Sequence, residues 1–404
     1  MSGRGVTRRQ FLRAAGGGAG VAAVSSLARA GDALANGGRR RLHVGVLVPT
    51  GGDEAGMAAS LLDGVRLGFG EDVDARIEAA EVLLGVHGAR ARAEEMLDAG
   101  ARVVIAGVSA PVALRLAGMF EERGARLVAA NAGAHVVRPR ERRASVTHVS
   151  LQQWQAAYAL GRWAAAKVGR RGLIAAPISD SGYDTVYALR RGFESAGGTV
   201  VGTMVTHAQE SGPSEHDVMA AVAEAGADVL LGLHSGSWGA DLIRAHAAAG
   251  RPVPLVGTGF LAQERSLRLQ GHAANGLRTV ASWSPALRTD ENRGFLRAFR
   301  QATGRQADAY AVLGHDAARI IAEGATRRGK RDRAVVASPR GPLRVSRTGI
   351  VLGPLYLRRV RSGSGGLEHA VVRRLKAPTA FPRPLSDLGR APASGYLNEY
   401  LCAT

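Results

Sequence analysis

LHVGVLVPTGGDEAGMAASLLDGVRLGF, residues 42–69, is the stretch of sequence that decides the fold. The apolar run at residues 42–48 stops at Pro49, and such continuous apolarity is typical of a strand buried on both faces of a parallel sheet. In such sheets ligands bind beyond the carboxyl ends of the strands, so the loop at residues 50–56 is a candidate site. Apolar residues at every fourth position then predict a helix with one apolar stripe: Met57, Leu61, Val65 and Phe69.

The same strand, loop and helix unit recurs along the chain, which predicts right-handed βαβ units and parallel sheets. The expected fold class is therefore α/β, with two doubly wound parallel-sheet lobes. Further strands are expected at residues 81–86, 103–106 and 127–130, and a second series at 173–176, 200–205, 229–233 and 255–256. After an extended segment at 277–283, we expect helices at 292–301 and 309–327, and short strands within 335–345 and 355–360.

The charge is strongly positive and almost entirely due to arginine. The formal net charge is +19, and the only lysines are Lys167, Lys330 and Lys376. The arginines are scattered, and no basic stretch is interleaved with the aromatic residues that stack on bases. This pattern favours solvated protein faces over a nucleic-acid surface, so we expect no nucleic-acid partner. The charge can still favour encounters with acidic ligands or with an anionic membrane surface.

Cysteine and histidine give no sign of a metal site. Cys402 is the only cysteine, which excludes a disulfide within the chain and a cysteine-built metal centre. The histidines are dispersed, without an HExxH pair or another spacing that would mark metal ligands. We therefore expect neither a metal nor a cofactor.

Residues 1–35 have the three parts of an export signal: a basic start, an apolar region at about 14–27, and small residues that suit cleavage at 28–30 or 33–35. Arg8 and Arg9, followed by Phe11 and Leu12, resemble a twin-arginine signal. The alternative is a membrane-anchoring helix, but the apolar region is too short and too rich in glycine to span a bilayer. We expect export by the twin-arginine machinery and a soluble periplasmic protein.

Five stretches carry a resemblance to a known family. They are VGVLVPTGG (44–52), MFEERGARLVAANAGA (119–134), ISDSGYDTVYALRRGFESAGGTVVG (178–202), ADVLLGLHSGSWGADLIRAHAAAG (227–250) and ASPRGPLRVSRTGIVLGPLYLRRV (337–360). In this order and spacing, the chain resembles the type I periplasmic binding proteins over residues 42–374. The resemblance is to the leucine/isoleucine/valine-binding family of ABC transporter substrate-binding proteins.

The resemblance implies two lobes joined by a three-segment hinge, with crossovers near residues 146–151, 277–283 and 334–338. Hinge segments absorb the dihedral change while each lobe stays rigid and closes on a ligand. The lobes would comprise residues 42–148 with 281–333, and residues 149–280 with 334–375, followed by a loosely ordered tail at 376–404. The implied function is a monomeric carrier that takes a small-molecule ligand in the cleft and delivers it to an ABC transporter permease.

Binding residues of the first lobe carry over onto two loops: Ser109 and Ala110, and Asn131, Ala132 and Gly133. Backbone N–H groups at helix starts suit a carboxylate ligand. The hydroxyl of Ser109 also suits an ordinary helix N-cap, and the sequence leaves both roles open.

In the second lobe the sequence departs from the pattern of amino-acid binders. Ser181 stands where they have a tyrosine, with Tyr183 nearby, and Ser235, flanked by His234, replaces another tyrosine. The acid that would hold the ligand's α-ammonium group falls at Gly259, before Phe260. Because a buried ammonium without an anion is costly, we expect a small carboxylate or amide without a free amine rather than an amino acid. Four aromatic residues suggest an aromatic ligand, although each also suits helix packing: Trp154, Tyr183, Trp238 and Phe260.

Two other functions were considered. A sensor that signals to a membrane receptor would have the same sequence features as a carrier. An exported enzyme is disfavoured, because the loop at 50–56 lacks the GxGxxG spacing and no GxSxG or Walker motif occurs. The acidic pair Asp180 and Asp184 could be catalytic, but Asp184 is better placed as a helix N-cap.

Overall fold

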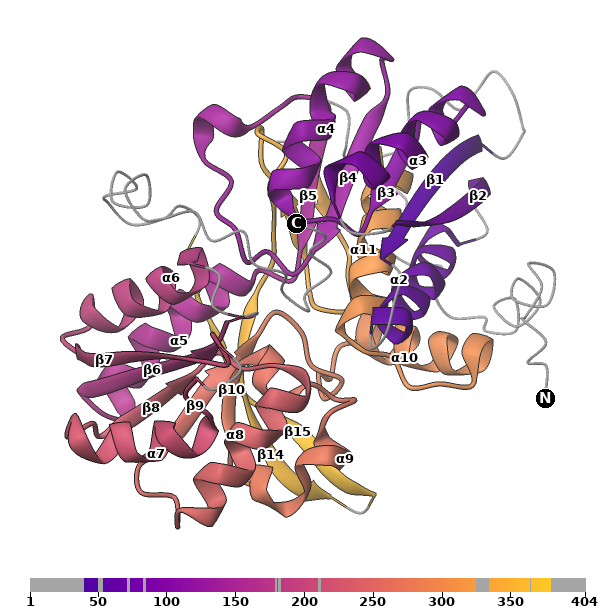
Figure 1. Cartoon of the computed structure of the whole chain (residues 1–404). Coiled ribbons are helices and arrows are strands. Elements are labelled where there is room, and N and C mark those ends of the chain that lie inside the picture. Colours follow the sequence, from indigo (N-terminus) through magenta and orange to yellow (C-terminus); the bar gives the residue numbers. More distant parts are fainter. Residues whose placement is uncertain are drawn as a thin grey trace.

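The computed structural model shows two α/β lobes, one above the other in Figure 1. It describes residues 40–49, 54–70, 73–82, 85–178, 180, 183–209, 212–324, 334–363 and 365–378. The predicted export signal, residues 50–53 of the first loop, Ser181 and the chain from residue 379 lie outside the described residues. No helix among the described residues is both long and apolar enough to cross a membrane.

The first lobe is built on a parallel sheet with the strand order β2-β1-β3-β4-β5. Its strands are β1 (Arg40–Pro49), β2 (Val73–Val82), β3 (Val103–Ala106), β4 (Arg126–Asn131) and β5 (Val146–Ser150). Its helices are α2 (Glu54–Phe69), α3 (Val86–Asp98), α4 (Ala110–Glu122), α10 (Asp290–Thr303) and α11 (Ala309–Ala322). The predicted apolar stripe of α2 is confirmed, because all four of its residues are buried in the core of this lobe.

Helices α2 and α11 cross in direct backbone contact. A Cβ atom on Gly64 would lie 2.0 Å from the Ala311 carbonyl oxygen, and one on Gly314 would lie 2.0 Å from that of Leu61. Glycine at both positions therefore permits the close approach that brings α11, far along the chain, onto the first lobe.

One predicted strand was wrong: the strand lies at residues 73–82 as β2, not at 81–86, and Val86 begins α3. β2 is an edge strand of the first sheet, and its residues alternate between apolar and polar, as at Ala75 (buried) and Arg76 (exposed). A search for continuous apolar runs misses such a strand, because only one side of an alternating strand needs to be apolar.

The second lobe has the strand order β15-β14-β10-β9-β8-β6-β7. Its parallel strands are β6 (Arg171–Pro177), β7 (Thr199–Thr206), β8 (Val229–Gly232), β9 (Leu255–Thr258) and β10 (Arg278–Ala281). The strands β14 (Leu355–Gly363) and β15 (Gly366–Leu375) extend the sheet in antiparallel fashion. Its helices are α5 (Gln153–Lys167), α6 (Tyr183–Glu194), α7 (Glu215–Glu224), α8 (Gly236–Ala248) and α9 (Leu267–Gln270).

A small three-stranded sheet lies beside the first lobe: β11 (Val335–Val336), β12 (Leu343–Val345) and β13 (Val351–Leu352). Its buried residues, such as Leu343 and Val345, belong to the same apolar core as β1, and the His148 N–H in β5 donates to the Gly349 carbonyl at 2.7 Å. Residues 335–352 thus pack with the first lobe, whereas the sequence prediction grouped them with the second. The chain makes its last crossing near Gly353, where β14 follows.

Buried polar contacts fasten the crossovers to one another. Gln152, which has a left-handed backbone (φ 57°), accepts a hydrogen bond at Oε1 from the Gly353 N–H at 2.8 Å. The Arg340 guanidinium donates to Asp316 at 2.6 Å and to the Ser150 carbonyl at 2.8 Å. Neither side chain of the Arg340–Asp316 pair is exposed, so a desolvated ion pair lies at the hinge.

Candidate functional site

The two first-lobe loops named from the sequence lie together. The Asn131 side chain joins them, because its amide Nδ2 donates to the Val108 carbonyl and its Oδ1 accepts from the Gly133 N–H, both at 2.9 Å. Ser109 is the N-cap of α4, and its hydroxyl accepts from the Val112 N–H at 3.4 Å. Ala110 begins that helix, and these residues and Ala132 are buried.

Phe260 brings the second lobe against one of these loops. It follows Gly259 in a 3₁₀ turn, Gly259–Ala262, that begins where β9 ends. Its ring packs in the same apolar cluster as Ala132 and Leu151 and lies 6.5 Å, between centroids, from the ring of Tyr310. The two lobes are therefore in contact where the family's ligand site was expected.

The other second-lobe candidates lie elsewhere. His234 is fully buried, and its Nε2 lies 3.3 Å from the Thr206 hydroxyl and 3.4 Å from the Glu215 carboxylate. Ser235 is the buried N-cap residue of α8, and Tyr183 is the first residue of α6. His234 thus contacts groups inside its own lobe, at the carboxyl end of the sheet.

Glu215 is the centre of this polar cluster. His207 also binds its carboxylate, at 2.8 and 3.0 Å, and stacks on the ring of Trp238. Burial opposes ionisation of Glu215, but hydrogen bonds from His234, from its own backbone and from His207 outweigh it and lower its pKa to about 2. Burial lowers the pKa of His234, which favours the neutral imidazole.

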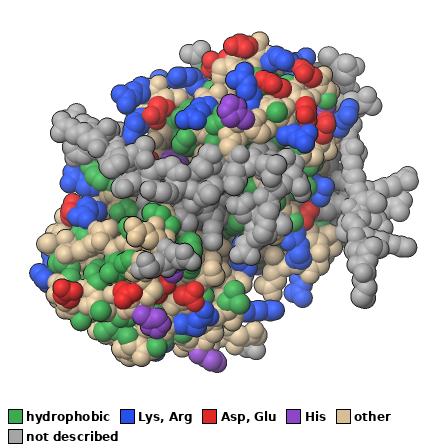
Figure 2. Space-filling model, in the orientation of Figure 1, with side chains coloured by type: hydrophobic (Ala, Val, Ile, Leu, Met, Phe, Trp, Pro, Cys, Tyr) green, Lys and Arg blue, Asp and Glu red, His purple; other side chains and the backbone are tan. Residues whose placement is uncertain are grey.

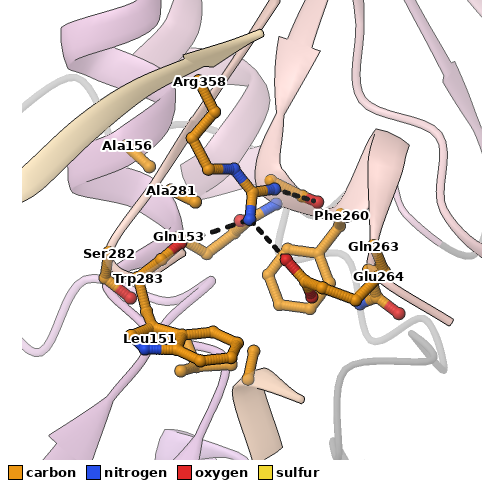
Figure 3. Close-up of a pocket in the computed structure, with 12 residues that line it drawn as sticks. Leu151, Gln153, Ala156, Phe260, Gln263, Glu264, Ala281, Ser282, Trp283 and Arg358 are labelled. Carbon is orange, nitrogen blue, oxygen red and sulfur yellow. Dashed lines mark hydrogen bonds and ion pairs between the residues drawn. The ribbon is translucent and has the colours of Figure 1, made fainter. Parts of the chain in front are cut away.

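A pocket lies between the lobes, next to the hinge (Figure 3). Its walls include Gly259 and Phe260, Gln153 at the start of α5, Trp283 after β10, Arg358 of β14 and Ala309 at the start of α11. The space inside it is about 30 Å³, enough for a water molecule but too small for an amino acid or an aromatic acid. A ligand of that size would therefore need the lobes to move apart from their positions in this structure.

Arg358 is the charged group of this pocket. Figure 3 shows it reaching from β14 toward Glu264, whose carboxylate it binds at 2.7 Å. It also donates to the carbonyls of Gly259, Ala262 and Trp283, each at 3.2 Å. Burial lowers the pKa of Arg358 and raises the pKa of Glu264. The negative charge of Glu264 limits the first shift, and the positive charge of Arg358 limits the second. The guanidinium thus fastens the Gly259–Ala262 turn to the strand behind it.

The packing leaves no room for a side chain at residue 259. A Cβ atom there would lie 2.6 Å from Ala281 Cβ and 3.3 Å from Arg358 Nη2. At the position where amino-acid binders are expected to have a carboxylate, this protein has Gly259, which has no side chain. The Arg358 guanidinium packs next to its backbone.

Sequence reasoning missed six polar or aromatic residues of the pocket: Gln153, Gln263, Glu264, Ser282, Trp283 and Arg358. Arg358 and Arg359 look alike in the sequence, yet β14 buries the first and exposes the second. Their positions next to the crossovers were a usable signal for Gln153 and Trp283. Among the residues that the structure describes, no three His, Cys, Asp or Glu side chains are placed to hold a metal ion.

Comparison with known proteins agrees with this two-lobed architecture. Residues 41–340 match the family model for periplasmic binding proteins. The chain belongs to this family. No curated protein sequence matches the chain.

Several solved structures are similar to this periplasmic binding protein. A solute-binding protein of an ABC transporter from Rhodopseudomonas palustris BisB5, in complex with 3,4-dihydroxybenzoic acid, is 19% identical and has a TM-score of 0.73, covering 85% of this chain and 99% of its own. An R. palustris solute-binding protein in complex with benzoate is 22% identical with a TM-score of 0.70, covering 84% and 99%. The closed leucine-, isoleucine-, valine-, threonine- and alanine-binding protein from Brucella ovis is 13% identical with a TM-score of 0.75, covering 85% and 97%.

Proposed function

We propose that this periplasmic binding protein captures a small aromatic carboxylate without a free amine in the interlobe cleft and delivers it to the permease of an ABC importer. The feature that supports the ligand class is Gly259. The family resemblance implies an acid at this position in amino-acid binders, whereas here the residue is glycine and its carbonyl accepts a hydrogen bond from the Arg358 guanidinium at 3.2 Å.

An α-ammonium group would find no free anion in this pocket. Glu264 is the acidic residue among the pocket's described walls, and its carboxylate is already paired with Arg358 at 2.7 Å. An amino acid would have to compete with that cation for Glu264, and leaving either charge buried without its partner is costly. A ligand without an amine avoids this cost.

The aromatic character of the ligand rests on the pocket walls and on similar proteins. The rings of Phe260 and Trp283 flank the pocket and offer apolar faces to a ring. Two of the similar structures hold benzoate and 3,4-dihydroxybenzoic acid. The first-lobe N–H groups at the start of α4 suit the carboxylate of such a ligand.

Calorimetric titration tests the ligand class. We expect benzoate or a hydroxybenzoate to bind, and leucine and benzamide to bind at least tenfold more weakly. The Phe260→Ala variant should lose affinity, whereas Leu269→Ala, at a residue that is 65% exposed, should not. Submicromolar leucine binding without a response to the aromatic acids would overturn the proposed ligand class.

Export is a separate part of the proposal. We infer that the twin-arginine machinery exports the folded chain and that it works as a soluble periplasmic monomer. An Arg8→Lys/Arg9→Lys variant should remain in the cytoplasm of its host, because paired arginines are the feature that this machinery reads. Unchanged export of that variant would overturn this part and leave the ligand class untouched.

A further inference from the structure

Two segments of the first lobe together form a surface that is unusually rich in arginine. The loop at residues 138–143, RPRERR, precedes β5, while β12 carries Arg344 and the turn after it carries Arg347. Arg142 donates from Nη1 to the Thr348 hydroxyl at 3.0 Å, which fastens the turn beside the loop. We call these six arginines, at positions 138, 140, 142, 143, 344 and 347, the arginine surface.

Acidic side chains are also present at the loop of this surface. Glu141 pairs with Arg138 at 3.4 Å, and Glu121 of α4 reaches the hydroxyl of Ser145 at 3.3 Å, at the foot of the loop. Arg143 donates to the carbonyls of Arg140 and Arg142, which are neutral acceptors. Four of the six arginines are exposed: Arg140, Arg143, Arg344 and Arg347.

Several other arginines of the protein pair with acids on the same helix. Arg90 pairs with Glu94 at 2.9 Å, and Arg293 pairs with Asp290 at 2.6 Å. Figure 2 likewise shows blue basic and red acidic side chains interspersed on the face in view. Residues 137–145 and 341–350, by contrast, contain six arginines and one acid, Glu141.

The composition of this surface indicates what it binds. Neither the stretch 137–145 nor the stretch 341–350 contains an aromatic residue. Nucleic acids without base pairing are held largely by aromatic stacking, and protein interfaces depend on buried aromatic anchors, so both partners are disfavoured. Binding to an anionic lipid surface requires no aromatic residues. The attraction is electrostatic, and the contributions of the individual basic residues add up.

We propose that the arginine surface binds anionic phospholipid headgroups. Each exposed arginine near such a membrane contributes about a fivefold gain in affinity. Such binding would hold the carrier close to the membrane that contains its permease. It depends on this surface alone and not on the ligand in the cleft.

Co-sedimentation of the purified protein with vesicles tests this proposal. We expect binding to vesicles of phosphatidylcholine with phosphatidylglycerol, release at high salt, and no binding to phosphatidylcholine alone. The variant Arg140→Gln/Arg143→Gln/Arg344→Gln/Arg347→Gln should bind the anionic vesicles at least tenfold more weakly.

A matched control separates this surface from the overall charge. The variant Arg162→Gln/Arg268→Gln/Arg278→Gln/Arg297→Gln removes the same charge from four exposed positions on α5, α9, β10 and α10, and should bind within about twofold of the original protein. The proposal would be overturned if both variants lost vesicle binding equally, or if the original protein did not bind the vesicles. It would also be overturned if the original protein bound single-stranded DNA instead of vesicles and the first variant lost that binding. An Arg140→Gln/Arg344→Gln/Arg347→Gln variant, which keeps the Arg143 hydrogen bonds, should still show a clear loss if the larger variant fails to fold.

Discussion

The carboxylate of Asp184, on the second lobe, accepts a hydrogen bond from the backbone N–H of Val136, on the first lobe, at 2.8 Å. The neighbouring Thr185 hydroxyl donates to the Ala134 carbonyl at 3.2 Å, and Val136 packs against the apolar core of the second lobe. The start of α6 therefore holds the loop after β4 across the cleft in this structure, and we expect separation of the lobes to break these contacts.

Removing this contact should favour the open form. A hydrogen bond to a charged acceptor contributes about 1.5–3 kcal/mol, so Asp184→Ala should weaken ligand binding by roughly tenfold or more. Small-angle scattering of the unliganded variant should give a larger radius of gyration. Asp290→Ala, at an exposed acid on α10, is the control and should change neither quantity. Equal affinities for Asp184→Ala and the original protein would contradict the role assigned to this contact.

Periodicity was sufficient to predict most of the architecture. The stripe from Met57 to Phe69, most of the parallel strands and the helices between them follow from apolar spacing, because burial on one or both faces dictates that spacing. β2 was misplaced for the same reason, since an edge strand is apolar on one side. Residues 146–150 were expected only as a crossover, but they form the parallel strand β5. The position of residues 335–352 was not predictable, because short strands show which side is apolar but not which lobe covers it.

The pocket was less predictable than the fold. Gly259 and Phe260, two of the residues predicted from the family resemblance, line it, and Asn131 links the two first-lobe loops. Arg358 and Arg340 are buried although arginine is usually exposed, and their acidic partners lie 94 and 24 positions away along the chain. Such pairs depend on tertiary packing, which no local pattern records.

Restoring an acid at residue 259 should not convert the site into an amino-acid site. The Cβ atom of Gly259→Glu would meet Ala281 Cβ, and overpacking of this kind costs about 1–3 kcal/mol of unfolding free energy. We expect a lower midpoint in urea and no calorimetric signal with leucine. The double variant Gly259→Ala/Ala281→Gly should be more stable than Gly259→Ala, because it removes the clashing atom. Tight leucine binding by Gly259→Glu would show that the missing acid alone had set the ligand class.

Acid should destabilise the protein through Glu215. Its pKa lies near 2, below the value of 4.5 for a free glutamate, so its stabilising contribution is complete above pH 4.5 and is lost as the pH falls toward 2. The shift corresponds to roughly 3 kcal/mol. The lowered pKa of His234 acts in the same direction, since protonation of the buried ring in acid opposes folding.

Urea unfolding between pH 7 and pH 3 measures this effect. Glu215→Gln should be less stable than the original protein at pH 7, and the difference should shrink as the pH falls. Glu224→Gln, at an exposed position at the end of the same helix, serves as the control for helix charge and should leave the slope with pH between 4.5 and 3 largely unchanged. Parallel curves for Glu215→Gln and the original protein would show that the carboxylate contributes nothing specific.

Removing one partner of the buried Arg340–Asp316 pair should lower the free energy of unfolding strongly. Replacing both partners with apolar residues should lower it much less. Burial opposes the charge of Asp316, but the Arg340 guanidinium at 2.6 Å outweighs it and lowers the pKa of this carboxyl group. Removing one partner leaves the other charge buried alone, so Asp316→Leu or Arg340→Met should each lose about 3–5 kcal/mol of unfolding free energy. The double variant should recover much of that loss, because no charge remains unpaired, although the Ser150 carbonyl still loses its donor. Urea unfolding of the four proteins gives the coupling energy between the two residues, and a value near zero would show that the pair does not hold the hinge.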